Sequence, residues 1–323
     1  MDENRPKIGI ALSGASGKAI AHIAVLEVLM ENNIPVDVIV GCSSGALIAA
    51  SFAAGTLDKL KQWFYNASLT KVLKLWSMKN AKGALFHINN KEMDRQLTEI
   101  TGGLRFEDIT HCRLGFVAAD LNTAELVVLN MGNINKAFKA SVAVPGLFEP
   151  VVWGRKILVD GGLVNVVPTL AVKQMGADIV IGVNIAATRF IYKQRLPIWR
   201  GYRFLSRIMG LPKLLFRIDS QSDVLEEEDI KVPGFLTVLS KAIEHSFHIQ
   251  ERWKESDEAC DLMLKPSVKN YGRTEFKSMK KIYLEGRRTA QAAIPQIRKL
   301  IENYKLSQQG NEKNTLAPKV YEH

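Results

Sequence analysis

The chain has 323 residues, of which 47% are apolar and 24% charged, a balance typical of soluble globular proteins. Its length allows one large α/β domain or two smaller ones, and no run approaches the roughly 18–20 apolar residues of a membrane-spanning helix. The formal net charge of +10 is concentrated in one stretch, which argues against an evenly basic nucleic-acid-binding protein.

The N-terminus and the cysteines indicate the compartment. Residues 1–6 are polar and lead directly into an apolar segment, a pattern without a signal peptide. The three cysteines, Cys42, Cys112 and Cys260, are odd in number and widely spaced, unlike a disulfide framework or a zinc site. We therefore expect a cytoplasmic protein that uses no metal and no other cofactor.

Strands and helices are predicted to alternate from the start of the chain. Residues 7–12 form an apolar strand, and a helical period of apolar residues follows over 18–31. A second strand, rich in β-branched residues, is predicted over 36–40, and a second helix over 46–54. Later strands are expected at residues 114–118, 125–129, 156–159 and 179–183. Strands linked by helices predict an α/β fold in which helices cover both faces of a mostly parallel sheet.

This rhythm changes in the second half of the chain. Residues 187–237 are first basic and aromatic, then acidic, and prolines interrupt them, so we interpret this region as an insertion or cap on a single domain spanning 1–306. The alternation then resumes with three elements, expected at residues 239–252, 262–265 and 275–306. The last of these, a long helix, is expected to kink or break near Pro295. The polar tail, 307–323, is expected to be disordered.

A G-x-S-x-G motif, Gly41-Cys42-Ser43-Ser44-Gly45, lies between a predicted strand and a predicted helix. This setting holds a serine in a strained, exposed turn, and the flanking glycines leave room for the neighbouring strand and helix. The positive N-terminal end of the helix favours a serine alkoxide and later an oxyanion. The motif predicts Ser43 as a nucleophile, and Ser44, one position out of register, as its control.

A serine hydroxyl is a weak nucleophile at neutral pH and needs a base, most often a histidine held by a carboxylate. Of the six histidines in the chain, His245 and His248 fit the usual Ser…Asp…His order. Both, however, lie on a predicted amphipathic helix without turn signals. The residue pattern alone therefore leaves the base open.

Four segments occur in order along the chain and carry a family resemblance. They are a small-residue loop with its helix (11–26), the serine motif with the following alanine (41–46), a segment at 141–151, and a segment at 159–168 that contains Asp160-Gly161-Gly162. Through these segments the chain resembles the bacterial patatin-like phospholipases from about residue 7 to residue 305.

The resemblance implies a patatin-like three-layer fold and hydrolysis of fatty acyl esters in phospholipids or lysophospholipids through an acyl-enzyme intermediate. It also implies a catalytic dyad, in which Asp160 takes the proton of Ser43 without a histidine, returns it to the leaving alcohol and then activates water. A free aspartate has a pKa of about 4. Partial desolvation would raise this pKa and make Asp160 a better base.

The resemblance further implies an oxyanion hole built from the backbone N–H groups of Gly14, Ala15 and Ser16. The family usually has three glycines here, and another glycine where this chain has Ala19 after Lys18. A residue with a Cβ costs roughly 1–2 kcal/mol where φ is positive, and loss of one N–H donor lowers the rate about 10²–10³-fold. A weak or inactive regulatory or adaptor protein is therefore one alternative, and a histidine-dependent carboxylesterase of soluble esters is another.

The stretch from Arg189 to Arg217 contains eight basic residues and no acidic one, interleaved with aromatic and aliphatic side chains. Such a segment is typical of contact with an anionic membrane surface, and equally of a core element with a solvated basic rim. The expected partners are a lipid substrate and, through this stretch, the inner face of the membrane. Nucleic acid is not expected.

Overall fold

The computed structural model describes residues 5–68, 70, 72, 91–186, 259–272 and 275–315. The predicted insertion at 187–237, with the basic stretch Arg189–Arg217, lies outside the described residues, as does the predicted helix at 239–252 with His245 and His248. None of the helices in the described ranges combines the length and the apolar character needed to cross a bilayer.

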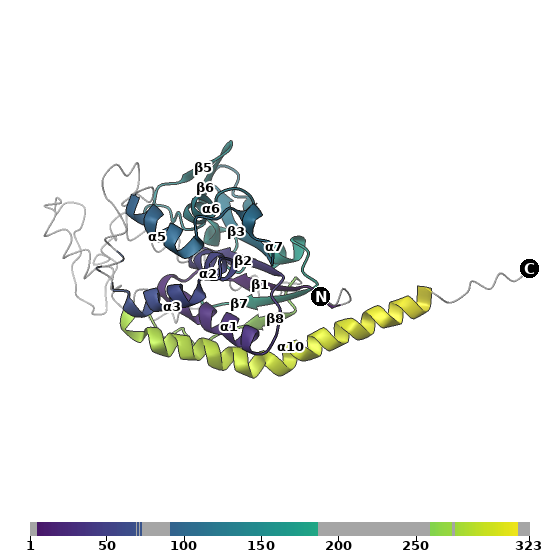
Figure 1. Cartoon of the computed structure of the whole chain (residues 1–323). Coiled ribbons are helices and arrows are strands. Elements are labelled where there is room, and N and C mark those ends of the chain that lie inside the picture. The colour runs from purple at the N-terminus through teal and green to yellow at the C-terminus, as the bar shows by residue number, and fades with distance from the viewer. Residues whose placement is uncertain are drawn as a thin grey trace, which may run out of the picture.

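A mixed sheet of eight strands forms the centre of the fold (Figure 1). Its order is β5-β6-β3-β2-β1-β7-β8, and β4 pairs with β3 off this path. The strands are β1 (Ile8–Leu12), β2 (Val38–Cys42), β3 (Arg113–Asp120), β4 (Leu126–Leu129), β5 (Val151–Trp153), β6 (Lys156–Asp160), β7 (Ile179–Val183) and β8 (Leu262–Leu264). β3, β2, β1, β7 and β8 pair in parallel, while β4, β5 and β6 are joined in antiparallel. The aliphatic β1, β2 and β7 are buried over their whole length, as parallel strands covered on both faces are.

Helices cover both faces of the sheet, so the fold has three layers. Successive strand residues face two separate apolar clusters, with Ile10 and Ile39 in one and Ala11 and Val40 in the other. The first cluster also contains side chains of α1 (Ile20–Glu31), α2 (Ser44–Ala53), α3 (Leu57–Asn66), α5 (Lys91–Thr101), α6 (Ile134–Ser141) and α10 (Met279–Thr315). The second contains side chains of α7 (Thr169–Gln174). This arrangement confirms the predicted α/β three-layer sandwich.

The longest helix, α10, lies along α1 on the outside of the first layer (Figure 1). Pro295 lies inside α10, which bends about midway along its length but does not break; proline removes one backbone hydrogen bond and crowds the preceding turn. The predicted helix end near 306 is wrong, because α10 continues to Thr315; disorder of the remaining tail stays a prediction. The helical segment 307–315 contains the good helix formers glutamine, glutamate and lysine. Residues 316–323 lie outside the described residues.

Candidate active site

The two residues of the predicted dyad lie at the ends of two strands that meet on one edge of β3. Residues 116–117 pair with both β2 and β4, so these two strands lie on opposite edges of β3. Residues 118–119 pair with both β4 and β6, which places β6 on the edge that β2 occupies. β2 and β6 run in opposite directions along this edge. β2 ends at Cys42, and β6 ends at Asp160, one register position further along β3. The two strand ends therefore point at each other and bring Ser43 close to Asp160.

Ser43 occupies the tight turn between β2 and α2. Its backbone has φ 52° and ψ −122°, a conformation that residues with a side chain rarely adopt. The motif glycines permit the turn. A Cβ at Gly41 would lie 2.4 Å from the backbone nitrogen of Ala46, and a Cβ at Gly45 would lie 2.5 Å from a backbone oxygen of β1. The structure thus contains a strained elbow with a half-buried Ser43 at the N-terminus of α2.

Hydrogen bonds to both carboxylate oxygens hold the side chain of Asp160. Ser43 Oγ donates to Asp160 Oδ2 at 2.7 Å, and the backbone N–H of Gly162 donates to Asp160 Oδ1 at 2.7 Å. Asp160 is only 1% exposed. Gly161 packs against β3, since a Cβ there would lie 2.4 Å from the carbonyl oxygen of Val117. One carboxylate oxygen is therefore held by the backbone while the other faces the serine hydroxyl, which is the geometry that a general base needs.

A further serine, Ser141, ties the elbow to β3. Its hydroxyl accepts a hydrogen bond from the N–H of Ser43 at 2.9 Å and donates one to the carbonyl oxygen of Val117 at 2.7 Å. Ser141 is fully buried and is the last residue of α6. It also opens the segment 141–151 that carries part of the family resemblance, but the sequence alone assigns its hydroxyl no task.

The predicted oxyanion loop, Gly14 to Ser16, lies beside the elbow. A Cβ at Gly14 would lie 2.8 Å from the Cβ of Ser43, so a glycine fits here and a larger residue does not. The N–H of Ala15 donates to the Ser44 hydroxyl at 2.9 Å, so Ser44 anchors the loop and is not the neutral control that its position predicts. The N–H groups of Gly14 and Ser16 make no hydrogen bond within the described residues. Ser16 has a positive φ of 54°, so a Cβ carries a backbone cost at this position. The φ of Ala15 is not positive, so its Cβ carries no such cost.

His22 is fully buried behind this loop. Its Nε2 donates to the carbonyl oxygen of Ser13 at 2.8 Å. Burial lowers the pKa of His22 to about 4, although the hydrogen bond to Ser13 favours the charged form. His22 is thus a neutral side chain that supports the start of the loop. Within the residues that the structure describes, no group of three or more His, Cys, Asp or Glu side chains is placed to hold a metal ion.

Several known proteins are similar to this chain. Two uncharacterized NTE family proteins of Mycobacterium tuberculosis are related to it. One is 27% identical over 180 residues, covering 56% of this chain and 49% of the relative, and the other is 26% identical over 294 residues, covering 89% and 46%. Lysophospholipase NTE1 of Debaryomyces hansenii is 24% identical over 187 residues, covering 56% of this chain and 12% of that protein. The chain thus spans about half the length of the mycobacterial relatives.

A family model also matches this chain. The model of the patatin-like phospholipases matches residues 10–173, a span that contains the loop, the elbow, Ser141 and Asp160. The solved structure of VipD from Legionella pneumophila covers 98% of this chain and 81% of its own, but at 12% identity and a TM-score of 0.35 it supports no conclusion. Because the family model matches half of the chain, the chain belongs to the patatin-like phospholipase family.

Proposed function

We propose that this protein hydrolyses fatty acyl ester bonds of phospholipids or lysophospholipids, with Ser43 as nucleophile and Asp160 as general base. The observation that carries the proposal is the 2.7 Å hydrogen bond from Ser43 Oγ to Asp160 Oδ2, made from a strained elbow at a helix N-terminus. The lipid substrate is supported by the family and by the Debaryomyces hansenii relative, which is named a lysophospholipase.

The proposed reaction follows from the two hydrogen bonds of Asp160. Asp160 takes the hydroxyl proton while Ser43 Oγ attacks the ester carbonyl carbon, and the Gly162 N–H holds the carboxylate in place. The protonated Asp160 gives this proton to the leaving alcohol, and an acyl ester remains on Ser43. Asp160 then takes a proton from water, whose oxygen attacks the acyl carbon. As the bond between Ser43 Oγ and the acyl carbon breaks, Asp160 returns this proton to Ser43 Oγ, and the fatty acid leaves.

The oxyanion that forms on the carbonyl needs hydrogen-bond donors. We assign this role to the N–H groups of Gly14 and Ser16, because the N–H of Ala15 is already bonded to the Ser44 hydroxyl. The predicted trio of donors thereby becomes a pair. The positive end of α2, on which the elbow sits, adds to their effect.

Labelling with a fluorophosphonate probe tests the proposal. We expect Ser43→Ala to abolish labelling, and Asp160→Asn, which keeps the shape of the side chain without its basicity, to slow labelling about 10²–10⁴-fold. Ser307→Ala and Asp58→Asn replace exposed residues and are matched controls that should label like the wild type. Labelling that survives in Ser43→Ala would contradict the assignment of the nucleophile.

The altered loop favours one alternative, a regulatory or adaptor protein on the same fold. Ser16 has a positive φ, and the N–H of Ala15 is occupied. A folded wild-type protein that the probe does not label would support this alternative. A histidine-dependent esterase instead predicts loss of labelling in His245→Ala or His248→Ala. Contact of Arg189–Arg217 with an anionic membrane stays a prediction, tested by vesicle co-sedimentation after charge reversal within the stretch.

A further inference from the structure

An apolar row crosses three neighbouring chain segments at the outer part of the sheet. Val152 of β5 pairs with Ile157 of β6, and the N–H of Leu121, one residue beyond β3, donates to the carbonyl oxygen of Ile157 at 2.8 Å. Directly opposed residues of antiparallel strands share one face, so these side chains are neighbours. Leu121 is 52% exposed, Val152 63% and Ile157 37%. We call these three residues the hairpin row.

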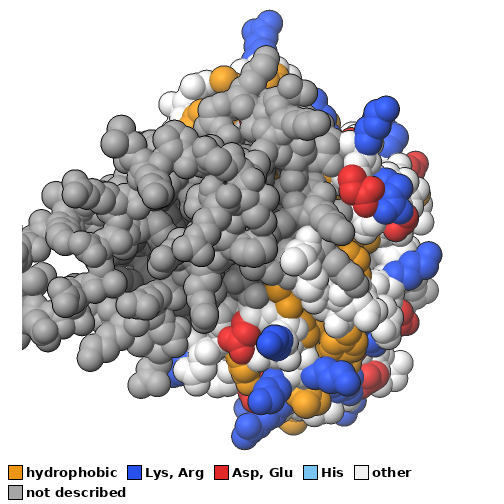
Figure 2. Space-filling view, turned by 90° about the vertical axis from the view of Figure 1, so that its left-hand side faces the viewer, with side chains coloured by type: hydrophobic (Ala, Val, Ile, Leu, Met, Phe, Trp, Pro, Cys, Tyr) orange, Lys and Arg blue, Asp and Glu red, His pale blue; other side chains and the backbone are white. Residues whose placement is uncertain are grey.

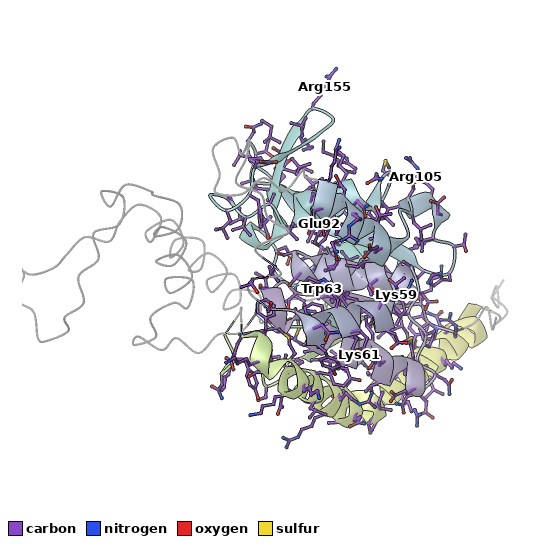
Figure 3. The ribbon with its side chains drawn as sticks, turned by 60° about the vertical axis from the view of Figure 1, so that its left-hand side comes forward. Lys59, Lys61, Trp63, Glu92, Arg105 and Arg155 are labelled. Carbon is purple, nitrogen blue, oxygen red and sulfur yellow. The ribbon has the colours of Figure 1, made fainter. Side chains whose placement is uncertain are left out.

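The turn between β5 and β6 adds positive charge beside the row. Arg155 extends from this turn away from the fold (Figure 3), and it makes no ion pair within the described part of the chain. The exposed Lys136 lies over the ring of Trp153, with its Nζ 5.2 Å from the ring centre. Figure 2 shows apolar side chains gathered beneath a basic tip at the top of the molecule, where Figure 1 places the β5–β6 hairpin.

The hairpin lies along the same edge of β3 as the strand that leads to Ser43. β6 occupies the edge of β3 beyond the point where β2 ends, so the hairpin extends past the carboxyl end of β2, where Ser43 lies. β6 runs from the turn to Asp160, which follows Ile157 by three residues. At roughly 3.3 Å per residue, this separation is about 10 Å. Because successive side chains of a strand alternate between its two faces, Ile157 and Asp160 point to opposite faces of the sheet. The row is therefore near the dyad along β6 but on the other face of the sheet.

We propose that the hairpin row docks into the interface of a lipid bilayer, with Arg155 beside the lipid phosphates. The inference rests on the proposed function, because a substrate held in a bilayer gives this surface its task. Exposed aliphatic side chains next to a basic residue are typical of contacts at the membrane interface. A stable protein interface buries about 800 Å² per partner, more than three partly exposed side chains supply, whereas each side chain that enters a lipid interface adds to binding. The row therefore fits a bilayer better than a second copy of this chain.

Vesicle co-sedimentation of the Ser43→Ala protein tests the row without hydrolysis of the vesicles. The probes are phosphatidylcholine vesicles with and without phosphatidylglycerol. Adding Val152→Thr and Ile157→Thr keeps both positions β-branched but makes them polar, and we expect binding to fall about tenfold or more. The matched control adds Leu170→Gln and Leu284→Gln, two leucines that are 48% and 60% exposed on α7 and α10, and should bind like its parent.

The charge at the tip is tested separately. Arg155→Glu should weaken binding to vesicles with phosphatidylglycerol more than to phosphatidylcholine alone, and Lys59→Glu on α3, away from the hairpin in Figure 3, should have the smaller effect. Thermal unfolding shows whether each variant folds. If the row variant does not fold, the substitution at the exposed Arg155 decides the outcome by itself.

Three results would overturn the proposal: unchanged binding of the folded variants, an equal loss in the leucine control, or a change of oligomeric state in the row variant without vesicles, which would indicate a protein interface. Fluorophosphonate labelling of the wild-type protein reports on the proposed function alone. If the protein binds vesicles through the row but is not labelled, the result supports the docking surface and contradicts the proposed activity.

Discussion

The Ser44 hydroxyl connects the proposed oxyanion loop to the first turn of α2. It accepts the hydrogen bond of the Ala15 N–H at 2.9 Å, and Gly14 on the same loop packs against Ser43. A hydrogen bond of this kind contributes about 1 kcal/mol net. If the bond holds the oxyanion donors in place, this energy corresponds to about fivefold in rate. Under the proposed function, Ser44 is therefore a positioning residue.

We predict that Ser44→Ala lowers kcat for a soluble ester about fivefold and changes KM little, because the loop loses its anchor while the nucleophile remains. Ser44→Thr, which keeps the hydroxyl, should restore most of the rate. Steady-state kinetics with a p-nitrophenyl ester measure both parameters. Wild-type kinetics in Ser44→Ala would refute the positioning role, and so would the complete loss of labelling expected of Ser43→Ala.

The sequence predicts the pair of side chains at the centre of the site but not the groups that hold them. Ser43 is predictable because its flanking glycines mark a local turn, and Asp160 because its own glycines belong to a recognisable segment. The partners of the Ser44 and Ser141 hydroxyls depend on distant parts of the chain. Ser141, for example, lies 98 positions from Ser43, and no local pattern indicates that the two meet.

At the scale of elements, the contact between α1 and α10 depends on a close approach of the two helices. At Gly286 of α10, an added Cβ would lie 2.4 Å from the carbonyl oxygen of Ala21 in α1. The next residue of α10 also joins the two helices, because the Arg287 guanidinium donates two hydrogen bonds to the Glu31 carboxylate, at 2.8 and 2.6 Å. A side chain at Gly286 would therefore push against the backbone of a helix to which α10 is bonded through the adjacent Arg287.

We predict that Gly286→Ala lowers the thermal unfolding midpoint. Alanine favours a helix over glycine by about 1 kcal/mol, but the clash with Ala21 costs about 1–3 kcal/mol or more. Gln291→Ala, at an exposed position of the same helix, is the control and should leave the midpoint unchanged or slightly higher. Circular dichroism on heating measures both. A higher midpoint for Gly286→Ala would show that α10 moves aside without cost.

The strands are the elements that the sequence predicts best. β1, β2 and β7 lie within two residues of their predicted bounds, because continuous aliphatic and β-branched runs favour few other structures. β5 has three residues, too few for a period to appear, and it is not predicted. At Pro295 the sequence leaves a kink and a break open, and α10 accommodates the proline by a bend.

The stability of the whole domain is expected to depend on pH through His22. This side chain is fully buried, and its Nδ1, the atom that would gain the proton, has no hydrogen-bond partner in the described ranges. Its pKa is about 4 in the folded protein, against an ordinary value of 6.5. Between these values the unfolded chain binds a proton that the folded chain does not. The stability from neutral His22 is therefore complete above pH 6.5 and is lost as the pH falls toward 4.

We predict that this group alone lowers the free energy of unfolding by on the order of 3 kcal/mol between neutral pH and pH 4. His22→Gln keeps a donor for the Ser13 carbonyl but cannot titrate, so its stability should fall less steeply over the same range. Urea unfolding at a series of pH values measures both slopes. Parallel curves for the two proteins would contradict the buried, neutral state of His22.

β3 sets the distance between the two residues of the proposed dyad, since β2 and β6 end at neighbouring positions along one of its edges. In terms of the gene, a codon added to β3 between these positions would insert one residue. It would move Ser43 and Asp160 apart by the rise of one strand residue, roughly 3.3 Å, and break their hydrogen bond. Codons added to the loops at 102–105 or 121–125 also lie between Ser43 and Asp160 in the sequence, but they leave the pairing of β3 with β2 and β6 unchanged. Homologues are therefore expected to vary in length in such loops and to keep the length of β3 constant.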